Sequence, residues 1–344
     1  MSSKEDFVES YRKIYTKLKK KSILRKPNYA ECSEEINDLV NSLKRQSKSQ
    51  PYIGFCLKAV ARCEEALKNL TLEAVAFSDA GFSFWQREME RSEYGYLSFG
   101  EDFSEAVDCY HLAISVYKRL NKPAISAALY FEMAGFCKEL GKNEEARDYF
   151  HTAAELQQEN SGLCAINSLE KSVECNILLR DYGNTCSDLI WMMKLASEIS
   201  TDTPTNTLVV SESGSLIVTP VRTSGIFQEI ITKNARSVYT MVMMEAKVSL
   251  ILVLILQGDF QQSRDFVSKL ERDATANGVT TNTFRLIIEL FETLIEQVER
   301  QDVEMVMAVQ RELHPWMTRQ QNTLVLMIIE ELNASLRLAS VANK

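Results

Sequence analysis

Glycine and proline are scarce in this 344-residue chain, which contains 12 Gly and 6 Pro. Average proteins use roughly 7% Gly and 5% Pro, about two and three times as much. Folds built from many tight turns, such as β-sandwiches, propellers and Rossmann sheets, need these residues at their turns. The scarcity therefore excludes those folds and predicts an all-helical protein. A hydrophobic content of 45% excludes wholesale disorder.

Residues suited to catalysis or metal binding are also few. The chain has three histidines, His111, His151 and His314, and no two of them share a helical turn. It contains no His-Glu-x-x-His zinc motif, no Cys-x-x-Cys pair and no Gly-rich phosphate loop. We therefore predict that the protein is not an enzyme, and that it has no catalytic residues, no cofactor and no metal.

Features of export and membrane insertion are absent as well. The eight cysteines lie mostly among apolar residues in helical patterns, which indicates packing in a reduced compartment. The first residues are charged and lack the apolar core of a signal peptide. The apolar stretch at 239–256 carries Glu245 and Lys247, and its uninterrupted part is too short to span a bilayer. These features predict a cytoplasmic protein without a transmembrane segment.

Apolar residues recur at helical spacing through most of the chain. Residues 55–67 and 284–298 place them at positions i, i+3 or i+4, and i+7, which line one face of a helix. Pro27, Pro51 and Pro123 stand where helices would begin, because proline is tolerated in a first turn. The pattern predicts about fourteen helices joined by short loops.

A short recurring motif indicates that the helices are paired. In each copy a turn ends at an aromatic or similar residue, and a small residue follows three positions later. The turns end at Phe103, Asn143, Tyr182 and Phe260, so the first two steps are 40 and 39 residues. Small residues let helices cross closely, as in the tetratricopeptide repeat, whose usual period is 34 residues. We predict an all-α, tetratricopeptide-like α-solenoid of antiparallel helical pairs; an irregular helical bundle is the alternative.

One segment, residues 201–225, lacks a helical pattern and holds ten Ser/Thr and no aromatics. We predict a flexible Ser/Thr-rich loop between an N-terminal helical-repeat part, residues 1–200, and a C-terminal part, residues 226–344, that continues the same solenoid. The helix that follows the loop is apolar almost without interruption over 248–256. A helix that is apolar on all sides is covered on all sides. Either neighbouring helices or a partner could provide that cover.

The net charge of -8 is unevenly distributed. Residues 1–50 carry 12 Lys+Arg against 7 Asp+Glu, whereas the remainder carries 27 against 40. The large acidic body repels nucleic acid, so we predict no nucleic-acid partner. We predict instead that the basic head docks on an acidic partner; an import signal, anionic lipid and a solvated helix end are the alternatives. The basic head is the cluster of six cations at 17–26, and the residues in it that we predict to bind the partner are Lys17, Lys19, Lys20, Arg25 and Lys26.

A tryptophan near the C-terminal end is a further candidate for partner binding. Trp316 follows His314 and Pro315, and Pro315 is expected to interrupt a helix there. A tryptophan in this position can cap the end of a helical core or anchor a partner. Both interpretations stay open at this point.

The N-terminal motif carries a family resemblance. Tyr11-Arg12, Lys-Leu-Lys-Lys at 17–20 and Leu-Arg-Lys-Pro-Asn at 24–28 resemble the start of the forty-kilodalton huntingtin-associated proteins, the factor VIII intronic-transcript protein family. The likeness continues through 51–67, 140–157 and 180–182 to Trp316 and 321–322, in an invertebrate-like form. The central linker of the vertebrate proteins is rich in proline, whereas residues 201–225 are rich in Ser/Thr. Properties that depend on polyproline are therefore not expected here.

The resemblance implies a non-catalytic scaffold or adaptor that binds and stabilises huntingtin. It implies a heterodimer in which the chain lodges between the arms of huntingtin, itself a helical-repeat protein. It also implies a link to Rab5 and early-endosome trafficking, with a cytoplasmic location, association with early endosomes and a nuclear pool.

Two other helical-repeat classes are alternatives. An attachment-protein-like adaptor in SNARE disassembly and vesicle fusion also stacks helical pairs of about this length, but that family ends in paired leucines, which residues 338–344 lack. A peptide-clamp co-chaperone needs Lys, Arg and Asn groups converging on a concave face. The expected first helices carry Glu132 and Glu174 instead.

Overall fold

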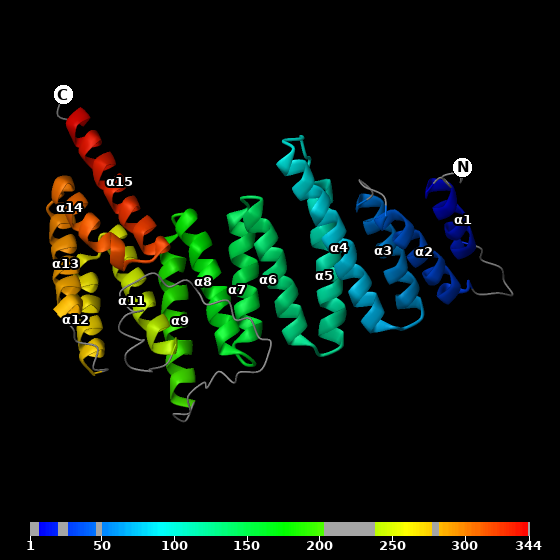
Figure 1. Ribbon diagram of the computed structural model, residues 1–344, viewed down its shortest axis with the longest axis horizontal. Coiled ribbons are helices and arrows are strands. Elements are labelled where there is room, and N and C mark those ends of the chain that lie inside the picture. The colour runs from blue at the N-terminus through cyan, green and yellow to red at the C-terminus, as the bar shows by residue number, and fades with distance from the viewer. Residues whose placement is uncertain (1–6, 20–26, 46–49, 203–237, 277–281, 343–344) are drawn as a thin grey trace. The chain divides into compact units, whose positions relative to one another are not determined.

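The computed structural model describes residues 7–19, 27–45, 50–202, 238–276 and 282–342 (Figure 1). All regular secondary structure in these ranges is helical, which confirms the predicted all-α class. The chain separates into two compact units, residues 1–160 and 161–344. Most of the predicted loop at 201–225 lies outside the described residues, and the division of the chain at that loop stays a prediction.

The first unit is a row of helices, each packed on the next along the chain. Successive helices run in opposite directions, as the predicted pairing requires (Figure 1). The helices are α1 (Phe7–Lys19), α2 (Tyr29–Lys44), α3 (Gln50–Ala66), α4 (Leu70–Glu93), α5 (Glu101–Arg119), α6 (Pro123–Glu139) and α7 (Asn143–Gln157).

The second unit begins in the same way, and its last helix then returns to an earlier one. The C-terminal helix α15 packs on α11 as well as on its neighbour α14. Tyr182 Oη, at the start of α9, donates a hydrogen bond to Glu331 Oε1 of α15 over 2.8 Å. The elements are α8 (Gly162–Leu178), α9 (Tyr182–Asp202), α11 (Val238–Leu256), α12 (Phe260–Ala276), α13 (Asn282–Glu299), α14 (Val303–Leu313), the 3₁₀ helix η1 (His314–Trp316) and α15 (Arg319–Ala342).

Each copy of the recurring motif lies at the start of a helix that packs on the helix before it. Helices α7, α9 and α12 begin at the residues that end their turns, and α5 begins two residues before Phe103. The small residues that follow are almost completely buried: Ala106 is 2% exposed, and Ala146, Thr185 and Ser263 are 0% exposed. Their small size lets the paired helices approach closely.

Among the described helices, seven end in the same closing turn, which explains how the chain manages with so little glycine. One residue after the C-cap is left-handed, with φ between 54° and 76°. The next N–H bonds to the carbonyl five residues earlier, which is the Schellman arrangement. Glycine supplies three of these left-handed positions, and ordinary residues supply four. The four are Lys68, Asn121, Arg180 and Gln301.

These non-glycine turns predict a stabilising substitution. Lys68→Gly is expected to raise the unfolding free energy of the first unit by about 0.5–1 kcal/mol. The substitution relieves the left-handed strain, and the added conformational entropy of the unfolded chain offsets only part of that gain. Urea unfolding followed by circular dichroism measures the change. Lys68→Ala removes the same charge but keeps Cβ, so it should give no gain. Equal midpoints for the two variants would contradict the prediction.

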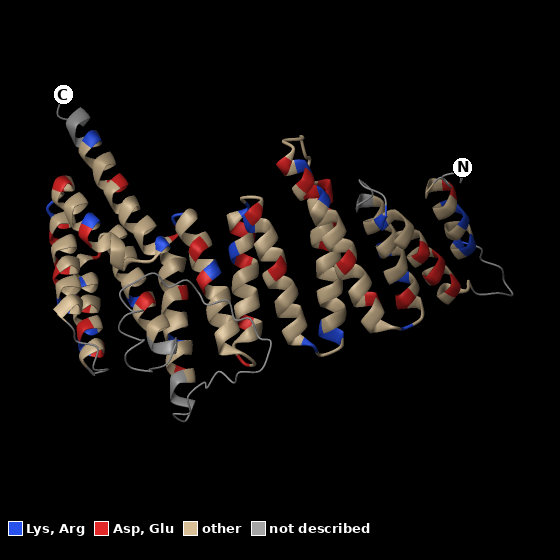
Figure 2. Ribbon diagram, viewed as in Figure 1, with Lys and Arg blue, Asp and Glu red and all other residues tan. Residues whose placement is uncertain are grey.

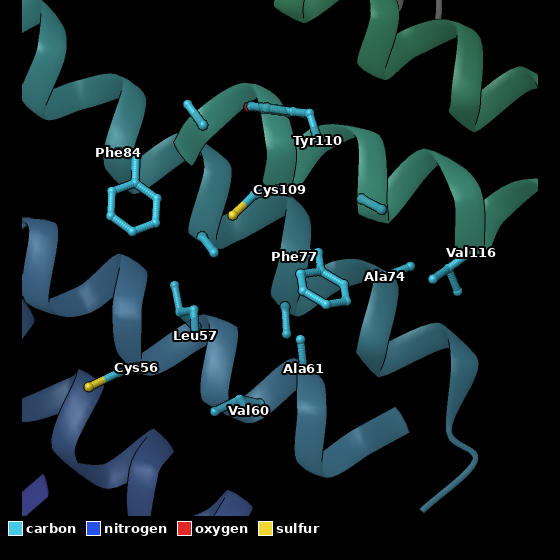
Figure 3. Packing of buried hydrophobic residues seen from close by; sticks show 14 of the residues in the cluster. Cys56, Leu57, Val60, Ala61, Ala74, Phe77, Phe84, Cys109, Tyr110 and Val116 are labelled. Carbon is cyan, nitrogen blue, oxygen red and sulfur yellow. The ribbon is translucent and has the colours of Figure 1, made fainter. Parts of the chain in front are cut away.

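Aromatic rings of α4 and α5 fill gaps left by glycines of the preceding helix in the first unit. Figure 3 shows the two rings, Phe84 and Tyr110. A Cβ at Gly54 of α3 would lie 2.8 Å from the ring of Phe84 in α4. A Cβ at Gly81 of α4 would lie 2.7 Å from the ring of Tyr110 in α5. Phe84 and Tyr110 are 0% and 2% exposed. The two glycines thus set the spacing of α3, α4 and α5.

The cysteines act mainly as small apolar residues, as the sequence predicted. Six of the eight are buried, and all eight are free thiols. Burial raises the pKa of Cys56 and of Cys109 to about 12, so both remain protonated and unreactive at neutral pH.

The very apolar helix α11 is covered by neighbouring helices rather than by an additional partner. It packs on α9, α12 and α15. Every residue from Val248 to Ile255 is buried. Lys247, at the start of this run, forms an ion pair with Asp273 of α12. Across the described ranges, no helix combines the length and apolar character needed to cross a membrane.

Candidate interaction surfaces

The structure describes only part of the basic head. Lys17 Nζ of α1 forms ion pairs with α2, at 3.4 Å from Glu31 Oε1 and in closer contact with Glu35. The hydrogen bond to Glu35 raises the pKa of Lys17. Lys19 Nζ lies 4.7 Å from the centre of the Tyr15 ring. Figure 2 shows the basic positions on α1 and the acidic positions on the neighbouring helix α2.

Two consequences follow for the predicted docking of the basic head. The charge of Lys17 is already balanced within the chain, so an acidic partner would compete with α2 for it. Lys20, Arg25 and Lys26 lie outside the described residues. The role of the basic head therefore stays a prediction.

Trp316 lies in a tightly held bend between α14 and α15. Its neighbours Leu313 and Met317 are 0% and 3% exposed, whereas Trp316 itself is only partly buried. Asn322 Nδ2 donates to the carbonyls of His314 and Met317, each over 3.2 Å, and so fastens the bend to α15. The geometry is compatible with capping the core and with anchoring a partner, and the role of Trp316 stays a prediction.

The sequence analysis missed an exposed aromatic loop, residues 94–100, which joins α4 to α5. Tyr94 and Tyr96 are 72% and 68% exposed, and Leu97 and Phe99 are 79% and 81% exposed. Leu97 and Phe99 are the most exposed large apolar side chains among the described residues. The signal was present in the sequence as aromatic residues without helical periodicity between two glycines.

The aromatic loop is held in place by its backbone. Tyr96 N donates to Arg91 O over 2.9 Å and closes α4, with Gly95 left-handed at φ 65°. At the other end, Gly100 N donates to Ser98 Oγ over 3.1 Å, and Gly100 is left-handed at φ 75°. The loop thus presents its side chains from a defined backbone.

The aromatic loop forms the rim of an open groove of about 690 Å³ in the first unit. One wall is α3, with Tyr52 and Phe55, which are 48% and 49% exposed. The other wall is the start of α5, where Glu105 forms an ion pair with Lys58 of α3. Helix α4 contributes two arginines to the groove. The groove residues are Tyr52, Phe55, Arg87, Arg91, Phe99, Gly100, Glu101, Asp102, Ser104 and Glu105.

The two arginines share one buried carboxylate oxygen. Asp102 Oδ2 lies 2.9 Å from Arg87 Nε and 3.2 Å from Arg91 Nη1. Neither ion pair has the alignment of a hydrogen bond. Each guanidinium carries five N–H donors in a planar fork. One carboxylate cannot use all of these donors, so some of them remain for other acceptors.

The second unit contains a smaller cavity, of about 210 Å³, where α8, α9, α11 and the start of α15 meet. Glu170 of α8 and Glu245 of α11 both line it, together with Arg319 and Gln320 of α15. Burial and, to a lesser degree, the charge of Glu170 raise the pKa of Glu245 to about 7. Gln320 Nε2 is buried and has no hydrogen-bond partner. In the described part of the chain, no cluster of His, Cys, Asp or Glu could hold a metal ion.

These features define the class of the protein: an all-α protein of stacked helical pairs with an exposed aromatic surface on its first unit. No family model matches the chain. The "40-kDa huntingtin-associated protein" of Rattus norvegicus is 27% identical, over 95% of this chain and 92% of its own length. The protein of the same name from Mus musculus is 34% identical, over 56% of this chain and 51% of its own length. The chain is thus similar to these proteins, to the first of them over nearly its whole length, and this is the resemblance that its sequence motifs predicted.

A comparison of folds adds little to this assignment. The crystal structure of BtubC (BKLC) from P. vanneervenii aligns with 80% of this chain and 91% of its own length. The sequence identity is 13% and the TM-score is 0.35, a likeness too distant to bear on function.

Proposed function

We propose that this chain is a non-catalytic partner of huntingtin that binds it as a heterodimer and stabilises it. The observation that carries the proposal is the likeness, over 95% of the chain, to a relative whose name states an association with huntingtin. The exposed aromatic loop supports a binding role, because large exposed apolar patches mark interaction surfaces.

The finer parts of the proposal follow from the family resemblance. The chain lodges between the helical-repeat arms of huntingtin and acts there as a scaffold. Through that complex it takes part in Rab5-dependent trafficking at early endosomes. Its proposed location is the cytoplasm, with association with early endosomes and a nuclear pool.

Reconstitution with purified proteins tests the central claim. The chain and huntingtin from the same organism are expected to elute together on size exclusion, with the mass of a one-to-one complex. Because a ligand that binds only the folded state stabilises it, the melting temperature of huntingtin should rise with the concentration of the chain. Separate elution, together with an unchanged melting temperature, would exclude the proposal.

The basic head predicts a salt-dependent contribution to this binding. Replacing Lys17, Lys19, Lys20, Arg25 and Lys26 by Glu is expected to weaken huntingtin binding about ten-fold to hundred-fold at low salt, and less at high salt, where charges are screened. Titration by biolayer interferometry at several ionic strengths measures the effect.

A matched control reverses exposed cations elsewhere in the first unit. Lys68 and Lys122 lie outside the basic head, so replacing both by Glu should leave the affinity for huntingtin nearly unchanged. If the five-residue variant binds like the wild-type chain at every ionic strength, the basic head is not part of the interface.

A further inference from the structure

We propose that the aromatic loop and the neighbouring Arg87–Arg91 pair form one docking surface, and that its occupant is a huntingtin segment bearing apolar side chains and a carboxylate. This inference rests on the proposed function, because it takes huntingtin as the partner. It goes further by assigning a surface to the interaction and a chemistry to the segment that covers it.

The apolar part of the surface is unusually exposed. The side chains of Tyr94, Tyr96, Leu97 and Phe99 are each at least 68% exposed. The contact between the Tyr94 and Tyr96 rings, whose centres are 5.8 Å apart, lies within the loop itself. Aromatic anchors of this kind dominate the binding energy of protein interfaces. Removing them from water is therefore a strong driving force for covering the loop.

The fixed backbone adds to that driving force. The closing turn at Gly95 and the Ser98–Gly100 hydrogen bond hold the two ends of the loop. Less conformational entropy is lost on binding when the binding side chains stand on an ordered backbone. A loop in this state is suited to recognising a folded surface.

The charges of the groove identify the second part of the occupant. Arg87 and Arg91 provide two positive charges against the single carboxylate of Asp102. On the opposite wall, Lys58 already balances Glu105. Glu101 is exposed on the first turn of α5, where the helix dipole favours its charge. The groove as a whole is not positively charged, but the guanidinium N–H donors that Asp102 leaves unused on Arg87 and Arg91 fit a carboxylate, which a guanidinium binds in a bidentate manner.

The shape of the groove brings both parts together. Phe99 and the arginines line the same groove, and Tyr52 and Phe55 face them from α3. A segment that packs against Phe99 and Phe55 can therefore reach the arginines with a carboxylate from the same side. All of these residues belong to the first unit.

The test measures huntingtin binding to full-length variants by biolayer interferometry. Combining Tyr94→Ser, Tyr96→Ser, Leu97→Ser and Phe99→Ser is expected to weaken binding at least about 100-fold, since these positions should include several hot spots. The melting temperature of the free chain should not change, because exposed side chains contribute little to folding. Leu72→Ser with Val75→Ser, on exposed positions of α4 outside the groove, should bind like the wild-type chain.

A second pair of variants tests the carboxylate. Arg91→Glu is expected to weaken binding about ten-fold or more, whereas Arg91→Lys, which keeps the charge but not the fork, should lose less. Arg87 still balances Asp102 in both variants. If Arg91→Glu binds like the wild-type chain, the assigned carboxylate is wrong.

The remaining outcomes separate this inference from the function on which it rests. If the wild-type chain binds huntingtin and the four-residue variant binds equally well, the docking surface is wrong and the proposed function stands. If the wild-type chain does not bind, both are wrong. If the free chain is a dimer that the four substitutions dissociate, and huntingtin binding is unchanged, the occupant is a second copy of the chain and the assignment to huntingtin is overturned.

Discussion

A Gly81→Val chain is expected to lose about 3 kcal/mol of unfolding free energy in its first unit. The new Cβ would lie 2.7 Å and 2.9 Å from ring atoms of Tyr110, and 3.1 Å from the backbone oxygen of Ala106. Tyr110 is 2% exposed and has little room to move aside. Overpacking of a buried contact costs roughly 1–3 kcal/mol, and a β-branched residue adds crowding within the helix. The loss should therefore lie at or beyond the upper end of that range.

The same chain offers a matched control in the next helical pair. Gly135 lies inside α6, and a Cβ added there would meet nothing within 4 Å. Gly135→Ala is therefore expected to stabilise the protein by about 0.5–1 kcal/mol, through better helix propensity. Gly81→Ala should destabilise it despite the same gain. Thermal and urea unfolding compare the three variants, and equal effects of alanine at the two positions would show that α4 and α5 are not in close contact.

This close approach also bears on function. Arg87 and Arg91 lie on α4, and the carboxylate that they share, Asp102, lies on α5. A larger residue at position 81 would push the two helices apart and disturb this cluster. Gly81→Val should therefore also weaken huntingtin binding, together with stability.

The second large effect is expected at Glu245, as a dependence of stability on pH. The pKa of this carboxyl is raised to about 7 in the folded protein, against 4.5 for an unperturbed glutamate. Between these two values the folded state holds a proton that the unfolded state has released, so stability falls as the pH rises through this window. Above pH 7 the group is ionised in both states and the full cost of burying its charge remains.

Glu245→Gln should remove that cost. The variant is expected to be more stable than the wild-type protein at pH 8, by roughly 1–3 kcal/mol after allowance for partial exposure. At pH 4.5 and below the difference should be small, because the wild-type carboxyl is then largely protonated in the folded state. The other titratable groups that line the same cavity as Glu245 are Glu170 and Glu174 of α8 and Arg319 of α15. Helix α9 contributes the apolar side chains of Leu189 and Met192.

Unfolding free energies measured from pH 4.5 to pH 8 test this expectation. Glu271→Gln, on an exposed position of α12, is the control for the loss of a carboxylate elsewhere in the second unit. A difference between Glu245→Gln and the wild-type protein that is the same at both ends of the range would contradict a raised pKa.

Much of the fold follows from local sequence patterns. A helix forms through hydrogen bonds and side-chain contacts within four residues, so apolar periodicity and proline positions were sufficient to predict where helices begin. The motif turns at Asn143, Tyr182 and Phe260 each start a helix. The left-handed closing turns at Lys68, Asn121, Arg180 and Gln301 were not predicted. Lys, Arg and Gln usually avoid that conformation, whereas Asn adopts it more readily, and the local hydrogen bonds of the closing turn hold all four residues in it.

The surfaces were less accessible to sequence reasoning. A run of cations predicts a basic head, but the pattern does not show that Glu31 and Glu35 of the next helix bind Lys17. An apolar run over 248–255 predicts that these residues are buried, but it does not show which helix covers them. In the structure α15, more than sixty positions later in the chain, packs on α11. Such partners depend on how distant helices cross.

The sequence by itself therefore determined the helical class, the starts of the paired helices and, through its motifs, the likeness to the huntingtin-associated proteins. The tertiary structure decided which side chains remain in water. The aromatic residues at 94–99 resemble core residues in type, yet they stand in a turn beyond the end of α4, where no helix covers them. Helices arise from interactions between near neighbours, whereas exposure depends on what the rest of the chain covers. An interaction surface of this kind becomes visible only once the helices are packed.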